Sequence, residues 1–426
     1  MRAMHVCVRE LPAYRLIDVA RSVEAEAAQL AVAEVIASQH DCEDLKDLLT
    51  APPHRYVPRR INVAAREAWP VGPGQTAYAP KDCFWIGRAA ASDGGWVVLR
   101  VQHQPQRDCV VLEVAAETSA MAEALLDTQI ERATRESIYR RRLLTVSFEA
   151  GIKDEFGDVE RAPRLNVFFR PEETFDEEAF IVDDGVREVL RRNVIDLHLR
   201  RELLKEHGVP VRRGVLLYGP PGTGKTFTCR YLCAQLPDVT RFVVAGMSLL
   251  QVRSIFNLAR LLQPSLVILE DVDLVFAARD LTGDGAGLGE LLDQMDGLRP
   301  FEDVSVILTT NALDRLEAAI KDRPGRISQC VHIGPPNDPL RRRYLLRHLA
   351  RYALDGLDLD ALVHLSRGTT QAFLKEWVHR AAQIALERPL AGDRLAPRTD
   401  DFRSALAEMR RGGDPATDRL IGFHDA

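Results

Sequence analysis

Residues 214–226 read GVLLYGPPGTGKT, a short apolar run followed by a glycine-rich loop that ends in lysine and threonine. Glycines let backbone N–H groups curl around phosphate oxygens, and a helix that begins at the end of the loop adds the positive end of its dipole. In this arrangement Lys225 reaches the β- and γ-phosphates, and the Thr226 hydroxyl binds Mg²⁺. The order of strand, loop and helix predicts a phosphate-binding loop, or Walker A motif. A glycine-rich turn without a ligand is the alternative.

A second motif lies at residues 266–273, LVILEDVD, an apolar strand that ends in carboxylates. A parallel sheet presents the groups at such strand ends along the edge where ligands bind. One carboxylate there helps to hold the metal, and a second orients or deprotonates the attacking water. We therefore interpret Glu270 and Asp271 as a Walker B pair. The alternative is that they are acidic residues solvated at a strand end.

Strands and helices alternate around these two motifs. Short apolar runs with strand character occupy residues 241–244, 266–269 and 304–309, with helix-length segments at 251–262 and 288–295. Four amphipathic helices are predicted after Pro335, at 339–354, 359–365, 371–386 and 400–409. The pattern predicts an α/β fold, a doubly wound parallel sheet with a C-terminal helical lid.

The region before residue 165 has a different pattern of predicted helices and strands. Apolar residues at helical spacing over 16–38 predict a helix, and prolines between 52 and 80 predict a loop-rich stretch. Strands are predicted at 96–101, 110–114 and 143–148, with a helix over 118–135. We predict an α+β N-terminal domain at 1–165, a linker at 166–179, a P-loop α/β subdomain at 180–335, a lid at 336–412 and a tail at 413–426.

Composition limits the possible partners. The 426 residues include 56 basic and 62 acidic ones, a formal net charge of −6, which gives no bulk attraction to nucleic acid or anionic membranes. The basic clusters 140–142, 191–192 with 200–201, and 341–343 lack interleaved stacking aromatics apart from Tyr139 and Tyr344. No apolar run approaches the roughly 20 residues that cross a bilayer, and no secretory signal is evident. Seven scattered cysteines without a C-x-x-C pair suggest neither disulfides nor zinc. We expect a cytoplasmic protein that contacts neither nucleic acid nor membrane.

Further segments give the chain its resemblance to a known family. These are the helix Glu290–Gly297 after the Walker B motif, Asn311 within ILTTNALDRL, and the sequence Arg323-Pro-Gly-Arg326. With the two Walker motifs, they make residues from about 175 to 410 resemble the AAA family of hexameric ATPases. The resemblance implies ATP and Mg²⁺ as cofactors, Asn311 as the sensor asparagine, and a homo-hexamer. It also implies that Arg323 and Arg326 are arginine fingers, which offset the charge on the γ-phosphate of a neighbouring subunit. A solvated loop is the alternative for these arginines.

The resemblance also implies the nucleotide contacts. Adenine contacts are expected at Ile181 and Val182, and phosphate-loop contacts at Pro221, Gly222, Thr223, Gly224, Lys225, Thr226 and Phe227. Gly368 and Ala372 lie where relatives place residues near the adenosine, and helix capping by Thr369 or Thr370 is the alternative there. The metal ligands implied are Thr226 and Glu270. The catalytic residues implied are Lys225, Glu270, Asp271, Asn311, Arg323 and Arg326.

Departures from the family pattern bear on function. The order Glu270-Asp271 reverses the usual pair, so the water-side carboxylate reaches one methylene less. The mitochondrial Rieske-protein translocase branch has a similar pair, and the chain resembles it, although we expect no membrane anchor here. The segment 245–250, AGMSLL, is shorter than in peptide-threading relatives and carries no aromatic residue, which makes stepwise threading doubtful. Met247 or Leu249 could form an apolar collar there or belong to the core, and the glycine-rich loop 279–287 occupies a second pore position.

Three functional hypotheses follow. The first is a ring-shaped ATPase that couples Mg²⁺-dependent hydrolysis to the remodelling of a protein client held by residues 1–165. The second is an ATP-gated scaffold or switch with little turnover, which the reversed Glu-Asp pair and the short pore segment favour. The third is an ATPase that remodels nucleic acid, which predicts stimulation by nucleic acid and a salt-sensitive affinity.

Overall fold

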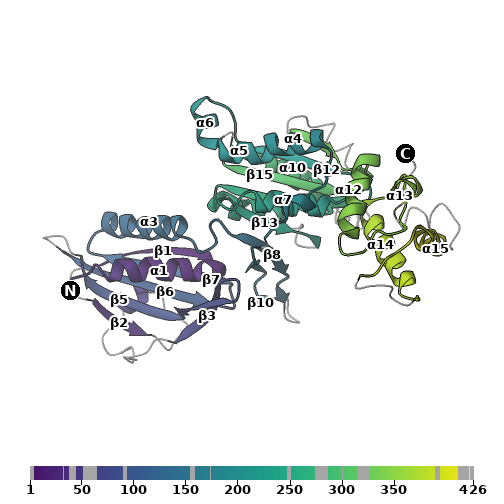
Figure 1. Cartoon of the computed structure of the whole chain (residues 1–426). Helices are drawn as coiled ribbons and strands as arrows, with labels where there is room; N and C mark the ends of the chain where they lie inside the picture. The colour runs from purple at the N-terminus through teal and green to yellow at the C-terminus, as the bar shows by residue number, and fades with distance from the viewer. Residues whose placement is uncertain are drawn as a thin grey trace. The chain divides into compact units, whose positions relative to one another are not determined.

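The computed structural model describes residues 4–31, 33–37, 45–50, 65–89, 94–153, 159–172, 174–246, 251–273, 286–299, 301–314, 327–388, 394–410 and 422. The chain divides into two compact units. One contains residues 1–171 and 257–263, and the other contains residues 172–256 and 264–426. Each unit has its own sheet and helices (Figure 1).

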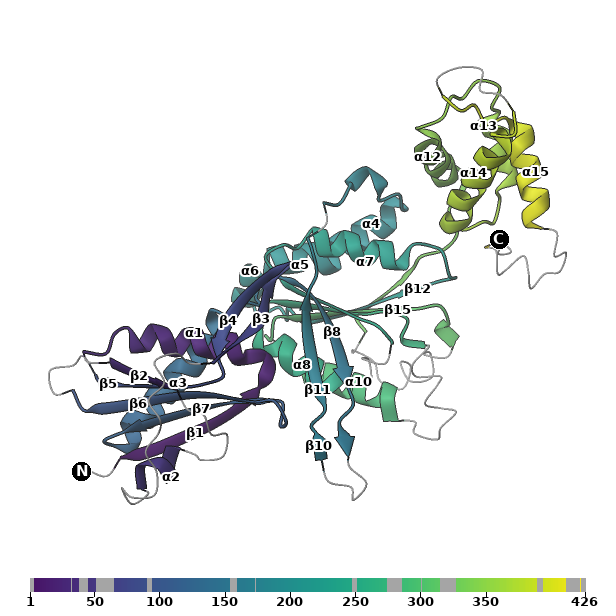
Figure 2. The same cartoon turned by 90° about the horizontal axis from the view of Figure 1, so that it is seen from below.

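The first unit is built on a five-stranded antiparallel sheet with the strand order β1-β7-β6-β5-β2. Its strands are β1 (His5–Pro12), β2 (Ala33–Ala37), β5 (Asp82–Arg88), β6 (Trp96–Gln104) and β7 (Cys109–Ala116). Helices α1 (Leu16–Ala27) and α3 (Ser119–Arg135) pack against one face of this sheet (Figures 1 and 2). The other elements are η1 (Ala13–Arg15), α2 (Leu45–Thr50), the hairpin β3 (Arg66–Gly72) and β4 (Gln75–Pro80), the hairpin β8 (Leu143–Glu149) and β11 (Arg164–Phe169), and the short pair β9 (Ile152–Lys153) and β10 (Val159–Arg161).

The two faces of this sheet differ in chemistry. Alternate residues of β6, such as Val97 and Leu99, are buried in the core beneath α1 and α3. On the opposite face Arg100 is only 1% exposed and donates to Asp82 at 2.9 Å and to Glu113 at 2.8 Å. Two carboxylates therefore satisfy one buried guanidinium, which is the condition under which a charge is tolerated in a protein interior.

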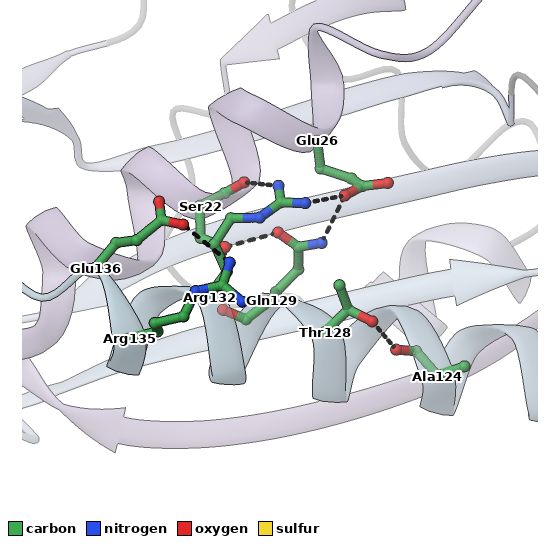
Figure 3. A network of polar contacts seen from close by, with 8 residues as sticks. All are labelled: Ser22, Glu26, Ala124, Thr128, Gln129, Arg132, Arg135 and Glu136. Atoms are coloured by element: carbon green, nitrogen blue, oxygen red, sulfur yellow. Dashed lines mark hydrogen bonds and ion pairs between the residues drawn. The ribbon is translucent and has the colours of Figure 1, made fainter.

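Polar contacts fix α1 against α3 (Figure 3). The Ser22 hydroxyl donates to Gln129 Oε1 at 2.9 Å, and Gln129 Nε2 donates to Glu26 Oε2 at 3.1 Å. Arg132 from the next turn of α3 donates to the same Glu26 oxygen at 3.2 Å. Because Gln129 is fully buried, these bonds satisfy a side chain that would otherwise destabilise the helix pair.

Some sequence predictions for this region are confirmed and others need correction. The strands predicted at 96–101, 110–114 and 143–148 lie within β6, β7 and β8, and the predicted helix 118–135 is α3. The helix predicted over 16–38 ends at Ala27, because residues 33–37 instead form β2 against β5. The stretch predicted as loop contains the hairpin β3–β4. The predicted boundary at residue 165 falls inside β11.

The second unit contains five parallel strands in the order β13-β14-β15-β12-β16. They are β12 (Arg213–Tyr218), β13 (Thr240–Val244), β14 (Ser265–Leu269), β15 (Val304–Thr310) and β16 (Gln329–His332). The helical elements that precede or connect them are η2 (Glu177–Ala179), α4 (Asp184–Leu190), η3 (Arg191–Ile195), α5 (Asp196–Leu199), α6 (Arg201–Glu206), α7 (Lys225–Ala234), α8 (Val252–Leu261) and α10 (Ala286–Asp296). Parallel strands joined through helices confirm the predicted α/β fold.

Four helices form the lid at the end of this unit, as predicted: α12 (Asp338–Leu349), α13 (Leu359–Leu365), α14 (Gln371–Ala385) and α15 (Thr399–Met409). Their core centres on Trp377, which is fully buried and packs edge-on against Phe402 with ring centroids 4.9 Å apart. The indole N–H of Trp377 donates to the Phe402 carbonyl at 2.8 Å. In the part of the chain that the structure describes, no helix combines the length and apolarity needed to span a bilayer.

Candidate functional site

The phosphate loop lies between β12 and α7, at the point where the strand order of the second unit reverses. Two positions of the loop need glycine for two reasons: the backbone has a positive φ there, and neighbouring atoms lie too close to leave room for a side chain. A Cβ on Gly219 would lie 2.1 Å from the Ile333 carbonyl oxygen, and one on Gly222 would lie 3.0 Å from the Ala372 Cβ. The loop is therefore packed tightly against the residue that follows β16 (Gln329–His332) on one side and against the lid on the other.

Lys225 is the first residue of α7 and is only 6% exposed. Its Nζ donates to the carbonyl oxygens of Gly219 at 2.8 Å and Pro220 at 2.9 Å. Burial lowers the pKa of Lys225, whereas the carboxylates of Asp271 and Asp273 act in the opposite direction. The ammonium group is thus held inside the loop, where a phosphate oxygen can replace the carbonyl groups.

The Walker B carboxylates follow β14, two strands away from β12 in the strand order. Asp271 adopts a left-handed backbone conformation, with φ of 50°. Its N–H donates to the Thr309 hydroxyl at 2.9 Å, and its Oδ1 accepts from Asn311 Nδ2 at 3.2 Å. Non-glycine residues in this conformation are held there by their surroundings and concentrate at functional sites. The structure thus brings the predicted sensor asparagine to the predicted water-side carboxylate.

Asp273 is a member of this cluster that the sequence interpretation missed. It is 6% exposed, and its Oδ1 accepts from the Thr310 hydroxyl at 2.9 Å and from the Asn311 N–H at 3.1 Å. The carboxylate therefore fixes the backbone of the sensor asparagine. The available signal was the spacing Asp271-Val-Asp273, which places both carboxylates near the same strand end.

One cleft of about 670 Å³ collects most of the predicted nucleotide contacts. Predicted residues that line it are Pro221, Gly222, Gly224, Lys225, Thr226, Phe227, Asp271, Asn311 and Ala372. Residues that line it without having been predicted are Ala179, Arg230, Tyr344, Arg347, His348, Gln371 and Lys375. A cleft of this size, with a phosphate loop at its floor and cations around it, suits a nucleoside triphosphate.

Several predicted residues stand outside the lining of this cleft. Thr223 is buried and donates to the Pro220 carbonyl at 2.8 Å, so it shapes the loop from within. Ile181 is 3% exposed, and its carbonyl accepts from the Tyr344 hydroxyl of the lid. Val182 follows Ile181 before α4, and Gly368 has a φ of 76° in the turn after α13. Arg323, Arg326, Met247 and Leu249 lie outside the described residues, as does most of the loop 279–287.

At the start of α14 one residue caps the helix and another lines the cleft. Thr370 caps the helix, because its hydroxyl accepts from the Phe373 N–H at 3.4 Å. Ala372 lines the cleft and donates its N–H to the Gly222 carbonyl at 3.1 Å. Thr370 therefore caps the helix, as one interpretation predicted, and Ala372 lines the cleft, as the other implied.

The lid side of the cleft is basic. Arg347 is paired with Asp176 at 2.6 Å, and burial, followed by Lys375, His379 and other nearby cations, lowers the pKa of His348 to about 4. Burial also raises the pKa of Tyr344 to about 12, so its hydroxyl stays protonated and donates to Ile181 at neutral pH. His348 is therefore neutral at pH 7, and the positive charge on this side of the cleft comes from Lys375 and from Arg347, which is paired with Asp176. A polyanionic ligand would compensate that charge.

The residues near the loop also fit a magnesium ion. Glu270 Oε1 is buried and has no hydrogen-bond partner among the described residues, so it has an acceptor to offer. Thr226 follows Lys225 and lines the cleft. Among the described residues, no group of three or more His, Cys, Asp or Glu side chains could hold a metal. Mg²⁺ takes one or two protein ligands and completes its shell with phosphates and water, so Thr226 and Glu270 would be enough to hold it.

The fold and the cleft define a P-loop nucleotide-binding domain with a Walker B pair. Its asparagine, Asn311, directly follows β15, the strand that lies between β14 and β12. Residues 215–335 match the family described as ATPase family associated with various cellular activities (AAA). The match confirms the predicted resemblance over these residues: this part of the chain is an AAA domain.

Related curated proteins bear names of proteasome subunits. A 26S proteasome regulatory subunit 8 homolog of Schizosaccharomyces pombe is 32% identical over 241 residues, which are 52% of this chain and 58% of that protein. The probable 26S proteasome regulatory subunit 10B of Caenorhabditis elegans is 35% identical over 245 residues, 53% of this chain and 59% of that protein. The chain therefore spans less than three fifths of the length of these relatives.

Proposed function

We propose that this protein is a Mg²⁺-dependent ATPase that works as a ring, a homo-hexamer, and remodels a protein client held by its N-terminal region. The observation that carries this proposal is the meeting of Lys225, Asp271 and Asn311 in one cleft. The names of the relatives, as regulatory subunits of a proteasome, favour a protein client over other substrates.

The roles of the residues follow from their contacts. Lys225 exchanges its bonds to the Gly219 and Pro220 carbonyls for phosphate oxygens when ATP binds. Asp271 accepts the proton of the attacking water, and Asn311 holds that carboxylate by donating its Nδ2–H to Asp271 Oδ1. Thr226 and Glu270 would hold Mg²⁺, which stabilises the charge that develops on the phosphates. The contact between Asn311 and Asp271 at 3.2 Å supports the roles of these two residues.

Steady-state ATP turnover tests the proposal directly. Wild-type protein should hydrolyse ATP, and Asp271→Asn should reduce kcat by at least 10²-fold while leaving ATP binding in place, because the amide cannot take up a proton. Asp355→Asn, at an exposed position of the lid, is the matched control and should behave as wild type. Turnover that Asp271→Asn leaves unchanged would remove Asp271 from the mechanism.

The arginine fingers can be tested by mixing variants. A chain that carries both Arg323→Ala and Arg326→Ala keeps an intact pocket, whereas Asp271→Asn keeps intact fingers. If arginines act across a subunit boundary, the mixture should regain turnover that neither variant shows alone. A mixture that stays inactive although the subunits assemble would contradict a shared site.

A nucleotide-gated switch is the second candidate. It is favoured by the shorter reach of Asp271, whose Oδ1 is occupied by Asn311 at 3.2 Å. This function predicts that ATP drives assembly while wild type and Asp271→Asn are equally inert. Stimulation of turnover by nucleic acid would favour the third hypothesis instead. Affinity capture with Asp271→Asn, which should retain both ATP and client, addresses the partner.

A further inference from the structure

Thr370 is held between two glycines from distant parts of the chain. A Cβ on Gly222 of the phosphate loop would lie 3.1 Å from the Thr370 Oγ1, and a Cβ on Gly422 would lie 2.6 Å from the same atom. Thr370 is 1% exposed, and Gly422 is also buried. Because both neighbours lack side chains at this point, the threonine can sit in close contact with both backbones.

Hydrogen bonds join the same three segments. The Thr370 N–H donates to the Gly422 carbonyl at 2.9 Å. Thr370 then caps α14, and two residues later the Ala372 N–H donates to the Gly222 carbonyl at 3.1 Å. An unbroken series of bonds therefore runs from residue 422 through the first turn of α14 to the phosphate loop.

The position of this series relative to the cleft gives it a functional meaning. Gly222 and Ala372 line the nucleotide cleft, and the same two residues, with Thr370, Phe373 and Gly422, also line a second cavity of about 360 Å³. Gly222 belongs to the loop that, in the proposed function, accommodates the phosphates. A displacement of Thr370 would therefore move Ala372, and with it the Gly222 carbonyl.

We infer that Thr370 is a positioning residue for the phosphate loop and that the backbone at Gly422 fixes it from behind. The backbone of Gly422 is thereby a third support of the nucleotide site, beside β12 and the lid helix α14. This inference rests on the proposed function only in taking ATP as the ligand. It predicts that a change at residue 422 weakens nucleotide binding although residue 422 does not line the cleft.

The test is a nucleotide affinity measurement on the full chain carrying Gly422→Ala. The new Cβ collides with Thr370 Oγ1, and the φ of 101° at this position is unfavourable for alanine. Loss of one buried hydrogen bond corresponds to an ATP affinity about 2- to 12-fold weaker. The same fold increase should appear in the KM for ATP, with kcat unchanged, because Asp271 and Asn311 are not touched.

Gly356→Ala is the matched control. Gly356 lies in the lid with a φ of 77°, but a Cβ there would meet nothing within 4 Å. The control therefore carries the backbone strain without the collision, and it should bind ATP as wild type does. Equal weakening in both variants, or an unchanged affinity in Gly422→Ala, would overturn the inference.

A double variant separates positioning from general destabilisation. Thr370→Ala removes the oxygen with which the new Cβ collides, so Gly422→Ala should weaken binding little further in that background. Full additivity of the two changes would contradict the inference. If Gly422→Ala does not fold, Thr370→Ala alone tests the inference in the full chain, and it should itself raise the KM for ATP because α14 loses the cap next to Ala372. Wild-type protein that binds no ATP would refute the proposed function itself.

Discussion

Replacing Asp273 with alanine tests whether the geometry around the sensor asparagine controls turnover. The Asp273 carboxylate is 6% exposed, and its Oδ1 accepts from the Thr310 hydroxyl at 2.9 Å and the Asn311 N–H at 3.1 Å. Alanine leaves both donors unpaired, at about 1–3 kcal/mol each. We therefore expect the free energy of unfolding to fall by about 2–6 kcal/mol.

The kinetic effect should be confined to kcat. Without Asp273 the Asn311 backbone can shift, and a displacement of about 1 Å at a reacting group can reduce a rate by roughly 10²-fold. Asp273 does not line the nucleotide cleft, so KM for ATP should change by less than about threefold. The measurement is steady-state ATP turnover, combined with binding of a fluorescent ATP analogue and a thermal unfolding curve.

Asp273→Asn provides the matched comparison. Both bonds end on Oδ1, so an amide oxygen at that position can accept both of them. Hydrogen bonds to a charged acceptor are roughly twice as strong as neutral ones, so asparagine should retain most of the turnover. The reasoning is refuted if Asp273→Ala unfolds more easily yet keeps the wild-type kcat, or if it raises KM and leaves kcat unchanged.

The remaining predictions concern the walls of the cleft. Lys225→Met should weaken ATP binding by about 10³-fold, because a charge pair at 4 Å is worth about 4 kcal/mol at the effective dielectric of a protein surface; calorimetric titration measures it. Tyr344→Phe removes the hydroxyl that donates to the Ile181 carbonyl, a loss of about 1 kcal/mol. ATP should therefore dissociate about fivefold faster in stopped-flow experiments, and an unchanged dissociation rate would show that this bond does not hold the lid. Burial lowers the pKa of His348 from 6.5 to about 4, so as the pH falls the unfolded chain binds the proton before the folded chain does. The contribution of His348 to the free energy of unfolding is therefore complete above pH 6.5 and is lost as the pH falls towards 4. His348→Gln should therefore reduce the fall in Tm between pH 6.5 and 4, and an unchanged slope would contradict the assigned pKa.

The parts of the site that could be predicted are those encoded by neighbouring residues. The phosphate loop needs glycines, a lysine and a threonine at fixed offsets, and the local backbone alone brings them to one ligand. The same holds for Glu270 and Asp271, which follow directly from a buried strand. Asn311 was placed by resemblance, and its contact with Asp271 depends on the pairing of β14 with β15.

The parts that could not be predicted depend on packing between distant segments. Tyr344, Arg347 and His348 share one face of α12, but nothing in their spacing says that this face meets the phosphate loop. In the first unit, the apolar residues at 33–37 suit a helix or a strand equally well. These residues form a strand because they pair with β5, and no local pattern reveals this pairing.

The packing of the phosphate loop explains how nucleotide state can reach the lid. If the loop glycines served only the phosphates, the lid would respond to ATP solely through its own contacts with the ligand. Yet Gly222 accepts a bond from Ala372 at 3.1 Å, and Gly219 lies against the Ile333 carbonyl so closely that no Cβ fits. The loop thus lies against Ile333, the residue that follows β16 in the sheet, and is bonded to α14 of the lid. We therefore expect a change in loop shape on binding or release of phosphate to reach the lid through the bond between Gly222 and Ala372, even where the lid does not touch the nucleotide.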